Sequence, residues 1–216
     1  IYSTILGVSK LFFQRNAPVI YKYIASLYYK VNVDLTKKEI FLPTQKKIIH
    51  IIDSDTGGGA EKLVSILQQN FEKNQKIITL KRLSEKNNSN SDYESLNIKF
   101  DGILSILLGV IGLIRLLFKV KDKNNLVLHS HLSKSLYVTF LASILCGINH
   151  IHTEHNTFNK RRSKSYLYPI EYLIYNSLSH IICISEPTRF ELLSYMSSIQ
   201  IENSSVIENG TKLYQY

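Results

Sequence analysis

The sequence predicts an α/β fold in which a doubly wound parallel β-sheet is covered by helices on both faces. From Lys47 onward, short apolar runs of strand length alternate with segments whose apolar residues recur at helical spacing. Alternation of this kind is typical of strand–helix–strand units, whose strands lie parallel. The chain has 216 residues, of which 44% are hydrophobic and 20% charged. A globular chain of this size and composition can bury one substantial core.

The expected strands are short apolar runs, each followed by a polar residue or a turn. The first ends in Asp53 and leads into a glycine-rich turn at residues 54–59. Polar residues also stand at the ends of three later runs, which is where open parallel sheets place their ligands. The expected strands cover residues 48–52, 76–80, 126–129, 150–153, 181–184 and 205–207.

The expected helices follow these strands, and several carry end signals. Ser133 is suited to cap a helix that Gly147 ends, and Pro187 suits the first turn of another helix. The polar stretch at 84–97, rich in Asn and Ser, is expected to be a loop. The expected helices cover residues 60–71, 102–118, 133–146, 167–178 and 187–196.

Two regions are expected along the chain, residues 1–45 and 46–216. The first is a basic, aromatic appendage that is expected to form short helices on a membrane or on the main domain. The second is the α/β domain. Because the chain begins without methionine and stops without an obvious terminal element, we expect it to be a fragment of a longer protein.

The net charge of +9 favours anionic partners such as pyrophosphates or an anionic membrane surface. No nucleic-acid motif accompanies the basic clusters, so nucleic acid is not expected. The most apolar segment, 103–118, is interrupted by Arg115 and is shorter than the roughly 20 residues that a bilayer requires. A largely buried helix is expected there, with a helix dipping into a membrane face as the alternative. Cys146 and Cys183 lie in apolar runs and indicate buried thiols in a reducing compartment.

Gly57, Gly58 and Gly59 stand between the first strand and its helix and are followed by Ala60 and Glu61. Glycines at such a turn allow backbone amides to approach an anion at the helix N-terminus. The pattern lacks the third glycine of the dinucleotide fingerprint and the Gly-Lys-Ser/Thr of a P-loop. On the motif alone, a phosphate-binding loop and a simple tight turn both remain open.

Histidines gather at two neighbouring strand ends. His129 and His131 lie two residues apart, so they share one face of an extended strand. A His-x-His pair near further histidines could hold zinc or a similar ion, and a core histidine bonded to backbone is the alternative. The core role is expected for His129 and His150, whereas His131 and His155 are the functional candidates.

Two polar motifs follow later strand ends. Lys160, Arg161 and Arg162 come soon after His155, where they could grip a phosphate or form a solvated charge run. Ser185, before Glu186 and a proline, can be interpreted as the hydroxyl cap of a helix.

Taken in order, these motifs resemble the N-terminal half of a family 4 glycosyltransferase of the GT-B type. The resemblance covers about residues 47–211 and is strongest to bacterial members that build surface polysaccharides. It is carried by five motifs: Gly-Gly-Ala-Glu after the first strand, His129-Ser-His131, His152-Thr-Glu-His155-Asn156 with Arg-Arg following, Ile181-Ile-Cys-Ile-Ser185-Glu186, and Val206-Ile-Glu-Asn-Gly210.

The resemblance implies a retaining transferase whose N-terminal Rossmann-like domain binds the acceptor and whose glycine loop faces the diphosphate of a UDP- or GDP-sugar donor. It implies no metal and no cofactor, because catalysis would be positioning plus electrostatic stabilisation of the leaving diphosphate. The implied residues are the donor-phosphate loop of Gly57, Gly58, Gly59 and Glu61; a catalytic His155; the acceptor contacts His131, Asn156, Arg161 and Arg162; and the further site residues Ser185 and Glu186.

The C-terminal donor-binding domain of that family, with its paired glutamates, is absent from this chain. The expectation is therefore an acceptor-binding half that is inactive alone and acts peripherally at the cytoplasmic face of the cell membrane, on a lipid-linked or saccharide acceptor. Two alternatives stay open: a metal-dependent hydrolase using His129, His131, His152 and His155, and a non-catalytic, membrane-associated binding module.

Overall fold

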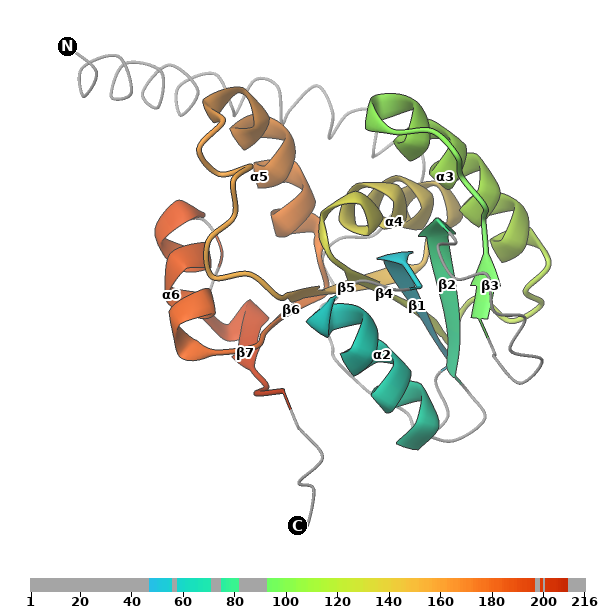
Figure 1. Cartoon of the computed structure of the whole chain (residues 1–216), viewed down its shortest axis with the longest axis horizontal. Helices are drawn as coiled ribbons and strands as arrows, with labels where there is room; N and C mark the ends of the chain where they lie inside the picture. The colour runs from blue at the N-terminus through green and yellow to red at the C-terminus, as the bar shows by residue number, and fades with distance from the viewer. Residues whose placement is uncertain are drawn as a thin grey trace.

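The computed structural model describes residues 47–55, 58–70, 75–81, 93–196, 199 and 201–209. These residues form a seven-stranded sheet in the order β3-β2-β1-β4-β5-β6-β7, and every pair of neighbouring strands is parallel (Figure 1). The expected doubly wound sheet is therefore confirmed. The strands are β1 (Lys47–Ser54), β2 (Gln75–Lys81), β3 (Tyr93–Ser95), β4 (Leu126–His131), β5 (Asn149–Glu154), β6 (His180–Cys183) and β7 (Ser204–Val206).

The strand order reverses between β1 and β4. The chain runs outward from β1 to β3 on one side, crosses back through a helix, and runs outward again from β4 to β7. In open α/β sheets, ligands bind outside the carboxyl ends of the strands at such a reversal. The fold thus directs attention to the ends of β1 and β4.

Helices cover both faces of the sheet, and the alternation of side chains along β1 shows which face each helix covers (Figure 1). Ile49 and Ile51 belong to the large core that α3 and α4 complete, whereas Ile52 packs with Ala60 and Val64 of α2. The helices are α2 (Gly59–Asn70), α3 (Gly102–Phe118), α4 (Ser133–Cys146), α5 (Tyr168–Ser177) and α6 (Glu186–Tyr195).

Two element predictions need correction. The stretch expected to be one polar loop contains the short edge strand β3, which pairs with β2. Ser133 does not cap α4. The helix begins after Leu132, which has a φ of 70°. The capping side chain is Asp53 of β1, which accepts hydrogen bonds from the backbone amides of Lys134 (3.3 Å) and Ser135 (2.7 Å). Gly147 ends the helix with a φ of 66°, as expected.

The long helix α3 is less buried than the sequence suggests. Gly109, Val110, Leu113 and Leu117 are among the residues it buries, and a Cβ on Gly109 would lie 2.8 Å from Val138 of α4, so the two helices approach closely there. Its other face exposes large apolar side chains. Among the described residues, no helix is long and apolar enough to span a membrane. The predicted appendage at 1–45 lies outside the described residues.

Candidate functional site

The carboxyl ends of β1, β4 and β5 lie side by side at one edge of the sheet. Ile52 of β1 pairs with His131 of β4, and His131 pairs in turn with Thr153 of β5. His155 and Asn156 follow β5 directly, and the N-terminus of α2 lies shortly after β1. The structure therefore brings several of the predicted site residues to the edge at which parallel sheets bind ligands.

The glycine turn before α2 is described from Gly58 onward, and Gly57 lies outside the described residues. Glu61 folds back over this turn, since Ser54 Oγ donates a hydrogen bond of 3.1 Å to Glu61 Oε1. A Cβ on Gly58 would lie 2.8 Å from Glu61 Oε2, whereas one on Gly59 would meet nothing within 4 Å. A side chain at position 58 would therefore have to displace the carboxylate of Glu61, while Gly59 leaves space beside the start of α2. The phosphate-binding role of this loop stays a prediction.

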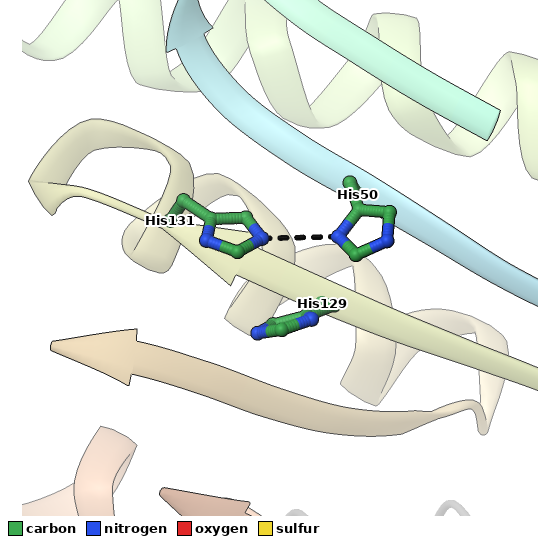
Figure 2. A group of neighbouring side chains, drawn as sticks. All are labelled: His50, His129 and His131. Carbon is green, nitrogen blue, oxygen red and sulfur yellow. Dashed lines mark hydrogen bonds between the residues drawn. The ribbon is translucent and has the colours of Figure 1, made fainter. Parts of the chain in front are cut away.

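Four histidines contact one another on the face of the sheet that α2 covers. His50 Nδ1 lies 3.0 Å from His131 Nε2 (Figure 2). His131 Nδ1 lies 3.1 Å from His155 Nε2. The ring of His129 stacks at an angle against that of His131, with centroids 4.1 Å apart, so the two share one face as predicted. Burial lowers the pKa of all four, to about 4 for His155, which keeps the rings neutral at neutral pH.

The two histidines expected to be core residues are buried, but side chains rather than backbone groups are their partners. His129 Nε2 lies 2.7 Å from Thr153 Oγ1. On the opposite face of the sheet, Ser130 Oγ lies 2.7 Å from His150 Nε2 and 2.8 Å from His152 Nδ1. Buried hydroxyl and imidazole groups therefore pair across neighbouring strands, although His150 Nδ1 has no hydrogen-bond partner among the described residues.

The arginines expected to grip a phosphate form ion pairs inside the protein. Arg161 Nη1 lies 3.0 Å from Glu171 Oε1 of α5, and Arg162 Nη2 lies 3.0 Å from Glu154 Oε2 at the end of β5. Tyr175 also donates a hydrogen bond of 2.5 Å to Glu154. These pairs attach the loop after β5 to the domain, which corrects the prediction of a solvated charge run. A contact with an acceptor stays a prediction.

Glu154 is ionised in spite of its burial. Burial alone would raise its pKa, but His152, Arg162 and Tyr175 outweigh that effect and lower the pKa of Glu154 to about 2. The remaining predicted residues are less enclosed. Asn156 is exposed, and the side chain of Glu186 is 73% exposed.

Ser185 is the N-cap of α6, as its place before Pro187 suggested. Its hydroxyl accepts a hydrogen bond of 3.3 Å from the backbone amide of Thr188. This structural role accounts for the residue by itself.

A cavity of about 200 Å³ opens beside the carboxyl ends of β1 and β2, at the starts of α3 and α4. Charged and hydroxyl groups stand on one part of its wall, where Lys134 Nζ lies 3.1 Å from Asp101 Oδ1. Apolar side chains form the rest. Its lining residues are Asp53, Ser54, Leu80, Lys81, Ile98, Phe100, Asp101, Ser105 and Lys134.

Sequence reasoning missed most of this cavity. Asp53, at the end of the first strand, was the available signal, because strand-end polar residues meet at one edge of a parallel sheet. Phe100, Asp101 and Lys134 carry no motif, and only the packing of α3 against α4 brings them to this position.

One group of described side chains could hold a metal ion. His50, His129 and His131 each offer a ring nitrogen, and these atoms all lie within 4.8 Å of one another. Three imidazoles are a common zinc ligand set. His50 Nδ1 and His131 Nε2 lie 3.0 Å apart, at hydrogen-bond distance, so a metal ion bound through these two nitrogens would displace a hydrogen bond.

The parallel sheet, its order and the strand-edge site define a Rossmann-like domain of the kind found in GT-B enzymes. The sequence profile of Glycosyltransferase Family 4 matches residues 77–214, more than half of the chain. The chain therefore belongs to glycosyltransferase family 4 and corresponds to an N-terminal domain of that family. No curated protein matches it significantly.

Solved structures share this fold. Alr3699/HepE of Anabaena, in complex with UDP and glucose, superimposes with a TM-score of 0.60 at 17% identity, over 77% of this chain and 45% of that one. The lipopolysaccharide outer core galactosyltransferase WaaB in its apo form gives 0.57 at 17% identity, over 78% and 47%. UDP-N-acetylglucosamine 2-epimerase from Rickettsia bellii gives 0.52 at 14% identity, over 76% and 45%. At these identities the matches establish the fold, and the chain spans less than half the length of each.

Proposed function

We propose that this chain is the acceptor-binding half of a retaining glycosyltransferase that moves a sugar from a UDP- or GDP-sugar to a lipid-linked saccharide in surface-polysaccharide synthesis. The cavity beside β1 and β2, in a chain that belongs to glycosyltransferase family 4, is the observation that carries the proposal. The UDP and glucose bound to HepE and the galactosyltransferase identity of WaaB support a nucleotide-sugar donor.

The cavity has the chemistry of a saccharide site. Asp53 and Asp101 can accept hydrogen bonds from sugar hydroxyls, and Lys134 can donate one. Phe100, which is 55% exposed, offers an apolar surface to the face of a sugar ring. Charged and hydroxyl groups beside the apolar side chains of Leu80, Ile98 and Phe100 give the cavity the mixed lining of a small-molecule site.

In the proposed reaction, the site positions the groups and stabilises charge. Gly59 and the N-terminus of α2 would face the donor diphosphate, where backbone amides and the helix dipole favour the negative charge that develops on the leaving group. His155, in its neutral form, would lie beside the reacting sugar or the acceptor hydroxyl. No metal or cofactor is required in this scheme.

Saccharide binding tests the proposal. Saturation-transfer NMR should detect binding of short oligosaccharides and their pyrophosphate-linked forms to the chain. Lys134→Ala should weaken that binding by tenfold or more, because it removes a donor from the cavity wall. The matched control is Lys164→Ala, which removes an exposed lysine outside the cavity and should leave binding unchanged. Binding that Lys134→Ala leaves intact, or no binding to any saccharide, would contradict the assignment of this cavity.

We also propose peripheral attachment to the cytoplasmic face of the cell membrane through α3. Exposed apolar residues recur along one side of this helix at positions 103, 104, 107, 108, 111 and 118, with exposed fractions of 36% to 77%. Lys119 and Lys121 lie exposed just after it. An apolar face flanked by lysines suits an anionic lipid surface.

Vesicle flotation tests this attachment. Vesicles containing anionic phosphatidylglycerol should carry the chain, and vesicles of phosphatidylcholine alone should carry less. The triple variant Ile103→Ser, Leu107→Ser, Ile111→Ser should lose most of the binding, while Leu145→Ser, at an exposed position of α4, should not. Equal flotation of the triple variant would assign membrane binding to another part of the chain.

A further inference from the structure

A continuous row of polar side chains runs through the sheet to His155. It begins at Gln75, the first residue of β2, whose Oε1 lies 3.1 Å from His50 Nε2. His50 Nδ1 lies 3.0 Å from His131 Nε2 (Figure 2). His131 Nδ1 lies 3.1 Å from His155 Nε2. His50 is 3% exposed and His131 is fully buried, so the contact between these two rings is shielded from water, whereas the contacts with Gln75 and His155 at the ends of the row are partly buried.

The direction of every hydrogen bond in this row follows from its first member. Gln75 Oε1 is only an acceptor, so His50 must carry its proton on Nε2. A neutral His50 then has a bare Nδ1, which requires a proton on Nε2 of His131. The bare Nδ1 of His131 requires, in turn, a proton on Nε2 of His155. One amide oxygen thus determines the tautomers of three imidazoles.

We propose that Gln75, His50 and His131 are positioning residues that hold His155 as its Nε2–H tautomer, so that Nδ1 is the ring atom available to accept a hydrogen bond from a sugar hydroxyl. The proposal deepens the proposed transferase function and depends on it for the identity of the ligand. It assigns a role to Gln75 and His50, which no sequence motif marked. The proposal also explains why His131 is fully buried, since His131 accepts a hydrogen bond from His155 and faces no solvent.

The row accounts for the ring nitrogens more completely than a bound metal ion does. In the row, His50 Nδ1 and His131 Nε2 form one hydrogen bond, so a metal ion bound through these two nitrogens would replace that bond. Metal binding there would no longer determine the tautomer of His155 through the row, because both ligating nitrogens would carry no proton. Zinc binding and the proposed row are therefore mutually exclusive at this pair.

Long-range proton–nitrogen correlation NMR on the 15N-labelled chain tests the proposal, because it distinguishes protonated from bare ring nitrogens. The expected spectrum at neutral pH has Nε2–H tautomers for His50, His131 and His155. His155→Gln assigns the signals of that ring. An Nδ1–H tautomer at His155, or one equivalent of added Zn²⁺ shifting the His50, His129 and His131 rings together, would overturn the proposal.

Variants at Gln75 separate positioning from simple structural support. Gln75→Leu removes the acceptor, and we expect a measurable fraction of His155 to change to the Nδ1–H form while the amide spectrum stays folded. Gln75→Glu keeps an acceptor oxygen and should restore the wild-type tautomers. Thr153→Val removes a partner of His129 outside the row and should leave His155 unchanged. A folded Gln75→Leu variant with an unaltered His155 would overturn the proposal.

These measurements use no sugar and no donor. If the tautomers are as expected but no saccharide binds, the positioning of His155 by the row is supported and the proposed function is contradicted. If saccharides bind but His155 is an Nδ1–H tautomer, the proposed function is supported and the positioning by the row is contradicted.

Discussion

Arg162 shows what a single side chain does for the loop after β5. Its guanidinium group and the carboxylate of Glu154 are 9% and 3% exposed and lie 3.0 Å apart. Arg162→Leu would leave an ionised carboxylate buried with fewer partners, and we expect a loss of about 3–5 kcal/mol in the free energy of unfolding. Urea denaturation measures this. The control Lys160→Leu, at an exposed position nearby, should change stability by about 0.5 kcal/mol or less. An Arg162→Leu variant as stable as that control would contradict the role of the pair.

Cys183 is a second residue whose chemistry is set by burial. It is fully buried, and burial raises the pKa of its thiol to about 11, with the neighbouring Glu154 adding to the shift. Since the thiolate is the reactive form, we expect iodoacetamide at pH 7.5 to modify Cys183 only after unfolding. Mass spectrometry with and without urea measures this. Half-buried Cys146 should react first, and rapid labelling of native Cys183 in a Cys146→Ser background would contradict the expectation.

At the scale of the elements, Asp53 joins β1 to α4. Its carboxylate accepts bonds from two amides at the start of α4, so a residue of the first strand caps a helix 80 residues later. Burial raises the pKa of Asp53, and the amide hydrogen bonds partly offset that effect. Asp53→Ala should cost about 1–2 kcal/mol, which corresponds to a fall of roughly 2–8 °C in the melting temperature.

Asp53→Asn provides the control for the cap. An asparagine keeps one acceptor oxygen, so calorimetry should find most of the stability retained. Equal destabilisation by both substitutions would mean that the negative charge, rather than the cap, is what α4 requires.

The strands and most helices could be predicted because their signal is local. The buried strands are continuous apolar runs, and Gly147 and Pro187 mark helix ends by their own backbone geometry. The edge strand β3 was missed because its three residues lie in a polar segment and form a strand only by pairing with β2. The cap of α4 was misassigned to Ser133 because its true partner lies on another strand.

The candidate site was predictable only where a residue's role depends on its own strand. His131 and His155 were predicted as candidates from their places at strand ends, and the structure brings the two rings into contact. Gln75 was not, because it meets His50 only through the register that aligns Ile48 with Gln75 across β1 and β2. The partners of Arg161 and Arg162 were hidden in the same way, since charge in a loop does not reveal which buried carboxylate lies beneath it.

At the scale of the whole molecule, the two faces of the sheet are coupled through their buried polar groups. The histidine row lies under α2, and the Glu154 and Arg162 pair lies beneath α5 and α6. Both converge on the end of β5, where Glu154 and His155 are consecutive and point to opposite faces. The position of His155 is therefore constrained from both sides of the sheet, and the role proposed for His155 in positioning a sugar hydroxyl would need such a constraint.

The same buried histidines make the whole domain sensitive to acid. Burial lowers the pKa of five rings below the ordinary value of 6.5: His50, His129, His131, His150 and His155. Below about pH 6.5 the unfolded chain therefore binds more protons than the folded chain, and the free energy of unfolding falls as the pH falls. Each such histidine contributes a slope of about 1.4 kcal/mol per pH unit.

Glu154 acts at lower pH. Its pKa is lowered from 4.5 to about 2, so its contribution to stability is present above about pH 4.5 and is lost as the pH falls toward 2.

Destabilisation between pH 6.5 and 5 is therefore due to the histidines. Since a domain of this kind has on the order of 5–15 kcal/mol of stability, we expect it to unfold cooperatively near pH 5. Urea midpoints measured from pH 8 to pH 5 should be nearly constant above pH 7 and fall steeply below it. His150→Gln should reduce the slope of the free energy of unfolding against pH by the contribution of one histidine, about 1.4 kcal/mol per pH unit. A flat profile would mean that these rings are protonated in the folded protein as they are in the unfolded chain.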